Sequence, residues 1–288
     1  MTAYDDFETL LVSRPESWVL HVMINRPAKR NAMNARFWIE FRECFERISR
    51  DADVRVVTVS GAGDHFSAGL DLEDTSNFDT IARETKDVAR RAFRFRTLAK
   101  TMQESFSSIE RCPQPVIAAL HGACVGGAVD LACACDIRFC SQDVKFCIAE
   151  VKVGLAADVG TLQRMPRIVG NESLCRELAY TGRTFGAAEA ARMGLVSQVL
   201  GPGSRRQEVV QASLVTAAEI ARQSPVAVFG TKRNLIYGRD HSIEDGLEYA
   251  ATWSGAALQA EDLRKAMGAS LRRKSSSKAP SHPGFSKL

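Results

Sequence analysis

Short apolar runs alternate along the first part of the chain with longer segments whose apolar residues recur every three or four positions. Residues 18–25 (WVLHVMIN) and 54–63 (VRVVTVSGAG) are apolar and rich in β-branched side chains, so they predict buried strands. An Arg-Pro pair ends the first run and a glycine turn ends the second. Between them, residues 31–51 have apolar side chains at helical spacing, and Asn34 is placed to cap that helix.

The same alternation continues through the middle of the chain. Residues 64–75 are predicted as a loop that leads into a helix, and the charged, amphipathic residues 81–111 as a helix. Residues 115–122 (PVIAALHG) predict a strand and residues 126–135 a helix. Residues 136–150 predict a short pair of strands joined by a turn. Because strands and helices alternate in this way, we predict an α/β fold.

After about residue 203 the strand signals stop. Three consecutive segments have the apolar spacing of helices: 206–223, 224–238 and 242–273. Helices that follow an α/β body are either a cap packed on that body or an oligomerisation element. We therefore divide the chain into a body, residues 1–203, a helical segment, residues 204–273, and a polar tail rich in Pro and Ser, residues 274–288.

The composition of the chain excludes several classes of protein but does not identify a function. The chain has 288 residues, of which 45% are apolar and 25% charged, as in ordinary globular proteins. The net charge of +4 is too small to favour nucleic acid as the main partner, although a local basic patch could meet an anionic small molecule. No run of eighteen apolar residues exists, so no membrane span is expected. The acidic start predicts neither a secretory signal nor a transit peptide.

Eight cysteines, five of them between residues 124 and 147, raise the question of a metal site. None belongs to a Cys-x-x-Cys pair, and no pair of histidines has the spacing of zinc ligands. In a chain of this size we interpret them as small buried apolar residues in a reducing compartment, and we expect no bound metal. His65 and His121 have no nucleophile placed beside them by a motif, so we interpret both as structural.

Two glycine-containing segments are candidates for holding a developing negative charge. In HGACVGGAVDLACACD (121–136) a predicted strand ends at a glycine pair and a helix begins, so the unpaired N–H groups of that helix face whatever lies against the glycines. In HFSAGLDL (65–72), Leu70 could offer a second N–H. Two such donors would form an oxyanion hole, in which each contributes about 2.7–4 kcal/mol to the transition state. For either segment alone, a tight turn is the alternative.

Three carboxylates stand in apolar surroundings. Asp130 lies in the first turn of an apolar helix, Glu150 ends the run FCIAE, and Asp158 lies in VGLAADVGT. Burial and mutual repulsion raise carboxyl pKa values, which suits acids and bases that work near neutral pH. Each also has a structural alternative. Asp130 could complement a helix dipole, Glu150 could pair with Lys152, and Asp158 could cap the helix that follows it.

Four blocks together resemble the enoyl-CoA hydratase/isomerase family, which has the crotonase fold. They are NRPAKRNAMN (25–34), HFSAGLDL (65–72), QPVIAALHGACVGGAVDLACACDIR (114–138) and GLVSQV (194–199), and the resemblance covers about residues 8–270. It implies a spiral of ββα units followed by a helical trimerisation segment, usually in a hexamer of two trimers. It also implies an acyl-CoA ligand whose thioester oxygen accepts two backbone N–H groups, which by position match Leu70 and Gly127.

Three further blocks resemble those family members that isomerise 3,5-dienoyl-CoA to 2,4-dienoyl-CoA in the β-oxidation of unsaturated fatty acids. They are residues 150–171, 223–242 and 249–253. The three acids of those enzymes match Asp130, Glu150 and Asp158. The hydratase pattern differs, because it has Glu at the first position and Gly at the third. Alternatives on the same fold are a 2-enoyl-CoA hydratase, a Δ3-Δ2-enoyl-CoA isomerase and a non-catalytic protein that binds acyl-CoA or RNA.

The implied reaction removes a proton from C2, forms a dienolate and returns a proton at C6. One carboxyl group cannot reach both carbons without moving, so two are wanted. Our hypothesis has Glu150 as the base and Asp158 as the acid, with Asp130 tuning or orienting them, and the first two roles could be exchanged. No metal or redox cofactor is expected, because electrons only relocate within the substrate. Lys29 and Arg30 are candidates for the CoA phosphates, with a solvated turn as the alternative, and Ala68 for the adenine.

The last three residues, Ser286, Lys287 and Leu288, form the address that the peroxisomal import receptor reads. They follow a polar stretch that is not expected to pack, so the tail would present them to a receptor. We therefore expect a peroxisomal matrix protein, in an ordinary peroxisome or a glycosome. A chance tripeptide is the alternative.

Overall fold

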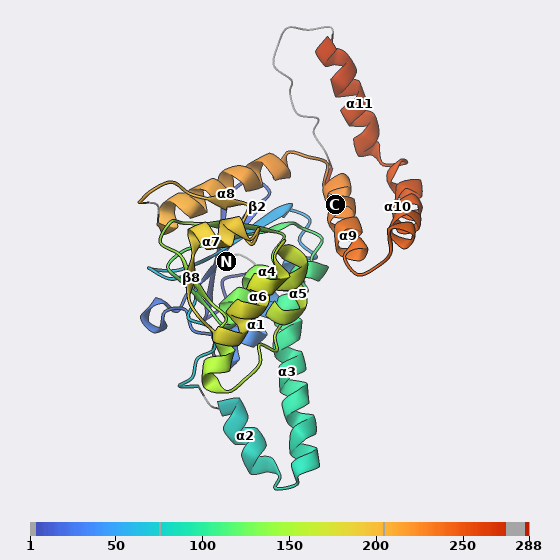
Figure 1. Cartoon of the computed structure of the whole chain (residues 1–288). Coiled ribbons are helices and arrows are strands. Elements are labelled where there is room, and N and C mark those ends of the chain that lie inside the picture. Colours follow the sequence, from blue (N-terminus) through green and yellow to red (C-terminus); the bar gives the residue numbers. More distant parts are fainter. Residues whose placement is uncertain (1–3, 75, 204, 275–285, 288) are drawn as a thin grey trace.

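The computed structural model describes residues 4–74, 76–203, 205–274 and 286–287. Its centre is a six-stranded sheet with the strand order β1-β2-β3-β4-β6-β9 (Figure 1). The strands are β1 (Leu10–Glu16), β2 (Val19–Ile24), β3 (Val56–Gly61), β4 (Val116–Leu120), β6 (Ile137–Cys140) and β9 (Gln198–Val199). β1 runs antiparallel to β2, and the other neighbours are parallel. The strands predicted near residues 18–25, 54–63 and 115–122 are confirmed, whereas β1 was not predicted.

A second sheet has three short strands, in the order β5 (Ala123–Val125), β7 (Lys145–Cys147) and β8 (Phe185–Gly186). The prediction that residues 136–150 form a strand pair is wrong, because β6 joins the large sheet and β7 the small one. The chain passes from one sheet to the other alongside the corner between β4 and β5. At that corner Ser141 donates its N–H to Leu120 O at 2.9 Å, and Lys145 donates to Gly122 O at 2.7 Å.

Helices cover one face of the large sheet and enclose the main core. α1 (Ala35–Ile48) is capped as predicted, since Asn34 Oδ1 accepts the Phe37 N–H at 3.0 Å. The helix predicted over 81–111 is two helices, α2 (Ser76–Glu84) and α3 (Val88–Arg111). The helix is interrupted between them because Asp87 caps the start of α3: its side chain accepts the Arg90 N–H at 2.7 Å. α4 (Gly127–Ala134) lies almost wholly buried beside them.

Short elements follow α4 and carry the chain back to the sheet edge. They are η2 (Glu150–Val153), α5 (Thr161–Ile168), α6 (Glu172–Thr181) and α7 (Ala187–Arg192), and another 3-10 turn, η1 (Pro27–Lys29), follows β2.

The opposite face of the sheet is closed by α8 (Arg206–Ala221). Alternate residues of a strand point to opposite faces, and Val19, Val56 and Ile117 form a second apolar cluster with residues of α8, whereas their neighbours Leu20 and Val57 belong to the main core. The first helix of the segment predicted over 204–273 therefore packs on the body (Figure 1).

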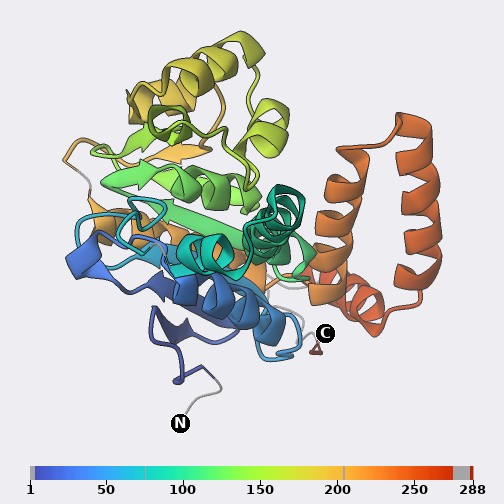
Figure 2. The same cartoon turned by 90° about the horizontal axis from the view of Figure 1, so that it is seen from below.

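The remaining helices, α9 (Pro225–Gly238), α10 (Ile243–Ala257) and α11 (Glu261–Lys274), form an arm beside the body (Figure 2). The single helix predicted over 242–273 is split between α10 and α11, so that α11 turns back and Asp262 accepts the Ser224 hydroxyl at 2.6 Å. α10 has no buried residue and packs on α9 through ring contacts such as Trp253 with Phe229. In the part of the chain that the structure describes, no helix has both the length and the apolar character needed to cross a membrane.

Candidate active site

Two loops that are far apart in the sequence meet at the start of α4. Ser67 donates its N–H to Ala123 O at 2.9 Å, and Val125 donates to Ser67 O at 3.1 Å, so the loop around Gly69 runs beside β5. Gly69 has φ +84°, and a Cβ there would come within 2.4 Å of Val125 O and 3.3 Å of the Gly127 nitrogen. Only glycine permits this backbone approach, which brings residues 69–70 against the first residue of α4.

The N–H groups of Leu70 and Gly127 are left without acceptors among the described residues. Met33 bonds to both neighbours of Leu70, donating to Gly69 O at 2.8 Å and accepting from Asp71 N at 3.1 Å, so the Leu70 N–H faces away from it. Gly127 is the first residue of α4, where an N–H has no acceptor within the helix. The two predicted oxyanion donors therefore lie side by side with free hydrogen-bonding capacity.

Asp130 lies in the first turn of α4 and is 1% exposed. Its Oδ1 accepts the Thr161 N–H at 2.5 Å, whereas Oδ2 has no hydrogen-bond partner among the described residues. Burial raises the pKa of Asp130 to about 7, and the negative charge of Glu150 adds to that rise. Asp130 is thus divided between its neutral and charged forms near neutral pH.

Glu150 begins η2 and is half-buried against the glycine pair. A Cβ on Gly126 would lie 3.2 Å from Glu150 Oε1, so the carboxylate lies against the turn that leads into Gly127. Oε2 is buried with no hydrogen-bond partner among the described residues. Burial raises the pKa of Glu150, and the charge of Asp158 raises it further. The alternative that Glu150 pairs with Lys152 is wrong, because the Lys152 ammonium contacts Cys147 Sγ at 3.6 Å instead.

Asp158 lies in the loop between η2 and α5, and its side chain is exposed. It does not cap α5, whose N-cap is Gly160, so the capping alternative is wrong. It borders a cavity of about 380 Å³ that Gln103 and Arg164 also line. Its charge raises the pKa values of both other acids, so all three carboxyl groups lie within electrostatic reach of one another. The structure therefore brings the three predicted acids together.

The candidates for binding a larger anionic ligand lie on the same loops but at the surface. Ala68 donates its N–H to Arg30 O at 2.9 Å, which places residues 29–30 beside the loop of Leu70. Lys29 and Arg30 are both exposed. Lys29 forms an ion pair with Glu73, which offsets part of its charge.

A large apolar cavity, which the sequence did not indicate, opens between α1, α2 and α3. It has a volume of about 860 Å³. Its apolar lining includes Trp38, Ile81 and Met102, and polar side chains such as Glu84 and Arg90 also border it. Trp38 also reaches the oxyanion pair, since a Cβ on Gly127 would lie 3.7 Å from its ring. One continuous helix was predicted here, but the chain turns at residues 85–87, and the cavity lies between the two helices that result. An apolar chain could extend from the paired amides into this space.

The cysteines are buried, as predicted, and the two histidines contact backbone groups. All eight cysteines are buried and free. Burial raises the pKa of Cys133 to about 12, which suppresses its thiolate. His65 Nδ1 accepts the Ala123 N–H at 3.2 Å, and His121 Nε2 lies 3.3 Å from Gly63 O. Among the described residues, no group of three or more His, Cys, Asp or Glu side chains is arranged to hold a metal ion.

Comparison with known proteins gives consistent matches. A model of the enoyl-CoA hydratase/isomerase family matches residues 14–276. Human mitochondrial Δ(3,5)-Δ(2,4)-dienoyl-CoA isomerase is 52% identical over 268 residues, which cover 93% of this chain and 80% of the human protein. The peroxisomal enzyme of that name from Arabidopsis thaliana is 42% identical over 287 residues, which cover 99% of both chains.

Solved structures of the same family also match the fold. The crystal structure of enoyl-CoA hydratase from Bacillus anthracis superimposes with a TM-score of 0.83 at 26% identity, and the match covers 96% of this chain and 100% of that one. The predicted α/β crotonase-like fold and the predicted resemblance are therefore confirmed.

Proposed function

The chain belongs to the enoyl-CoA hydratase/isomerase family, and from that premise we propose that it isomerises 3,5-dienoyl-CoA to 2,4-dienoyl-CoA in the oxidation of unsaturated fatty acids. Relatives named for this reaction are 52% and 42% identical over nearly the whole chain. One structural observation carries the proposal: Asp130, Glu150 and Asp158 converge beside two unpaired backbone N–H groups.

The two free amides define where the thioester would lie. A thioester oxygen that accepts from Leu70 and Gly127 N–H places its C2 next to the glycine pair, where the Glu150 carboxylate lies. As C2 loses its proton, negative charge moves onto that oxygen, and prepositioned donors stabilise it without further reorganisation. The apolar cavity between α1, α2 and α3 would take the remainder of the acyl chain.

Glu150 is the base at C2 in this proposal, and Asp158 the acid at C6. Glu150 is the acid that lies against the oxyanion turn, and burial strengthens it as a base. Asp158 lies beside α3, where Gln103 donates to its backbone oxygen. From there it would reach the end of the nearly flat diene that is distal to the thioester. Asp130 is buried beside Glu150, and its neutral form would leave Glu150 free to carry the negative charge.

The test measures two activities of the purified protein. We expect a 3,5-dienoyl-CoA to give the ultraviolet absorbance of a conjugated 2,4-dienoyl thioester, while a 2-enoyl-CoA loses little of its absorbance through hydration. Rapid hydration without diene formation would contradict the proposal and favour a hydratase. If neither substrate reacted, a binding protein would be favoured.

The two acid roles are tested by separate substitutions. Glu150→Gln and Asp158→Asn should each lower kcat by about 100-fold or more, because each removes one proton-transfer group. Glu172→Gln, on the exposed face of α6, is the matched control and should retain full turnover. If either Glu150→Gln or Asp158→Asn retained full turnover, the assignment of that residue would be wrong.

Proteins of this family act on acyl-CoA and usually form oligomers, and we propose a homotrimer or a hexamer of two trimers here. Lys29 and Arg30 would meet the CoA phosphates, and the backbone at Ala68 the adenine. No metal or redox cofactor is needed beyond the CoA of the substrate, because the reaction moves electrons only within that substrate.

We also propose that the protein resides in the peroxisomal matrix and that the import receptor binds Ser286-Lys287-Leu288. Leu288 lies outside the described residues. The Arabidopsis thaliana relative is named as peroxisomal and the human one as mitochondrial. A fluorescent protein fused to the N-terminus should collect in peroxisomes and should disperse when Leu288 is deleted. A mitochondrial pattern for the intact fusion would contradict the proposal.

A further inference from the structure

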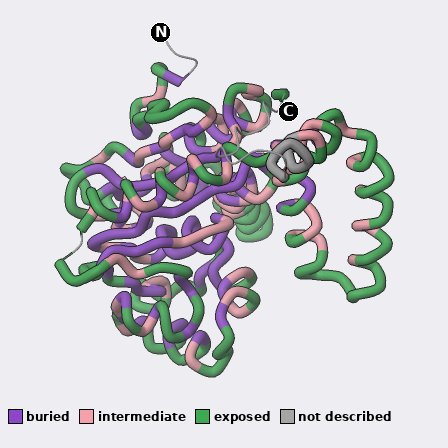
Figure 3. The backbone as a smooth tube through the Cα atoms, turned by 90° about the horizontal axis from the view of Figure 1, so that it is seen from above, coloured by how far each residue is buried: buried purple, intermediate pink, exposed green. Residues whose placement is uncertain are grey.

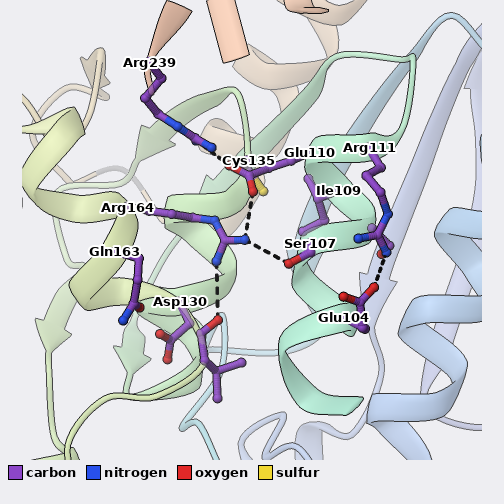
Figure 4. A network of polar contacts seen from close by, with 12 residues as sticks. Glu104, Ser107, Ile109, Glu110, Arg111, Asp130, Cys135, Gln163, Arg164 and Arg239 are labelled. Carbon is purple, nitrogen blue, oxygen red and sulfur yellow. Dashed lines mark hydrogen bonds and ion pairs between the residues drawn. The ribbon is translucent and has the colours of Figure 1, made fainter. Parts of the chain in front are cut away.

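A charged network lies next to the loop of Asp158 and takes no part in the chemistry described above; Figure 4 shows it together with Asp130. Its centre is Glu110 of α3, whose Oε2 accepts from Arg164 of α5 at 2.8 Å and whose Oε1 accepts from Arg239, at the end of α9, at 2.5 Å. Arg164 also donates to Ser107 Oγ at 3.2 Å. Burial alone would raise the pKa of Glu110, but the two guanidinium groups outweigh it and lower that pKa. The network therefore stays charged at neutral pH.

Arg164 also holds the loop that carries Asp158. Its Nη1 donates to Val159 O at 3.4 Å. At Gly160, which has φ +142°, a Cβ would come within 1.8 Å of Arg164 Nη1, so the guanidinium lies directly on the backbone of that glycine. From α3, Gln103 donates to Asp158 O at 2.8 Å. Backbone groups of the loop are therefore held by side chains of α3 and α5.

The carboxyl group of Asp158 itself has no such support. No hydrogen bond or ion pair of this carboxyl group is found among the described residues, and the side chain is exposed. Its position is therefore set by its backbone. Proton transfer to a fixed carbon needs a donor placed to within a fraction of an ångström, so the loop contacts bear directly on the rate.

We propose that Arg164 and Glu110 are positioning residues for Asp158: Glu110 fixes the Arg164 guanidinium, and that guanidinium fixes the loop from which Asp158 reaches the substrate. This inference rests on the proposed function. Arg239 joins the network from the end of α9, so the attachment of the arm is linked to the same loop.

The first experiment compares kcat and KM for a 3,5-dienoyl-CoA in Arg164→Met and in the wild type. Arg164→Met should lower kcat about 100-fold, because displacement of a reacting group by about 1 Å costs that much. KM should stay within about twofold, because the oxyanion donors and the apolar cavity are untouched. Glu110→Gln keeps an oxygen that can accept from Arg164, so its kcat should fall less.

The second experiment separates positioning from a general structural role. Arg164→Met is combined with Asp158→Asn, which already removes the proton donor. If Arg164 acts through Asp158, the double variant should have the same kcat as Asp158→Asn alone. A further loss of about 100-fold in the double variant would show that Arg164 acts independently of Asp158 and would overturn the proposal.

Arg111→Met is the matched control, because Arg111 forms an ion pair with Glu104 at 2.5 Å on the same helix but does not contact the loop (Figure 4). It should leave kcat unchanged, and all variants should show the circular dichroism spectrum of the folded protein. If Arg164→Met had a wild-type kcat, the positioning role would be wrong while the proposed function stood. If the wild type did not isomerise the substrate, the proposed function would fail instead.

Discussion

The carboxyl group of Asp130 is buried in an apolar helix. One of its oxygens accepts a hydrogen bond from Thr161, and the other has no partner among the described residues. Its folded-state pKa of about 7 exceeds the ordinary value of 3.8 that describes an unfolded chain. The folded state therefore binds this proton more tightly than the unfolded state does. The stabilisation is complete when pH lies below the unfolded value, and it is lost as pH rises through about 7.

Replacing Asp130 by asparagine should shift the balance of stability toward the variant as pH rises. The amide oxygen of the new side chain would still accept the Thr161 N–H, but the side chain would not titrate. The free energy of unfolding of Asp130→Asn, relative to wild type, should therefore increase from about pH 4 to about pH 7 and then level off. Urea unfolding of both proteins at a series of pH values measures this difference. A difference that did not change with pH would show that Asp130 titrates normally in the fold.

The site could be predicted from the sequence only in part. The resemblance identified Asp130, Glu150 and Asp158, and the structure brings them together. Arg164 and Glu110 were not predicted, because they are 54 positions apart and no motif connects them. Their pairing depends on how α3 and α5 pack, which spacing along the chain does not reveal.

Among the elements, α9 is joined to the body by a buried cation. Lys232 is 4% exposed, and its ammonium donates to Ile109 O at 2.9 Å and Gln114 O at 3.0 Å. It also lies 2.8 Å from Asp136 Oδ2. These acceptors lie at the end of α3 and beside β4, so one side chain secures the first helix of the arm.

Lys232→Met should destabilise the protein by about 3 kcal/mol, because it leaves a partly buried carboxylate and two carbonyl groups without their donor. Urea denaturation measures the loss. Arg176→Met is the matched control: it breaks an exposed pair with Glu172, at 2.6 Å, and should cost no more than about 0.5 kcal/mol. Equal losses in the two variants would mean that Lys232 is not an anchor.

The helices and strands also show where the periodicity of apolar residues fails to predict structure. It located β2, β3 and β4 because their apolar runs are continuous, and Asn34 marked the start of α1. It missed β1, an edge strand whose burial pattern is mostly exposed and which contains a proline. We predicted that β6 and β7 pair with each other because they are neighbours in the sequence. In the structure β6 instead pairs with β4 and β7 with β5, both in parallel. Long-range pairing of this kind has no local signature.

At the scale of the whole molecule, much of the arm is exposed (Figure 3), and several of its exposed residues are apolar. Ile243 is 85% exposed, Leu235 71% and Leu247 66%, and α10 packs mainly against α9. Exposed apolar groups that cluster on one element mark an association surface. They support the proposed trimer, in which copies of the arm would cover one another.

Ile243→Asp combined with Leu247→Asp should therefore dissociate the assembly. Sedimentation should give the mass of three or six chains for the wild type and a single chain for the double variant, because buried unpaired carboxylates oppose association. Leu11→Asp, on β1 away from the arm, is the control and should leave the mass unchanged. A wild type that sediments as a single chain would contradict the proposed assembly.

The three acids differ in their access to water: Asp130 is buried, Glu150 is half-buried and Asp158 is exposed. In the proposed reaction, each turnover leaves Glu150 with one proton too many and Asp158 with one too few. Because Asp158 is open to solvent, its missing proton comes from water. The hydrogen that the substrate loses at one end is then not the one it gains at the other. In heavy water, the product would carry the isotope at its distal carbon, as a record of which acid faces the solvent.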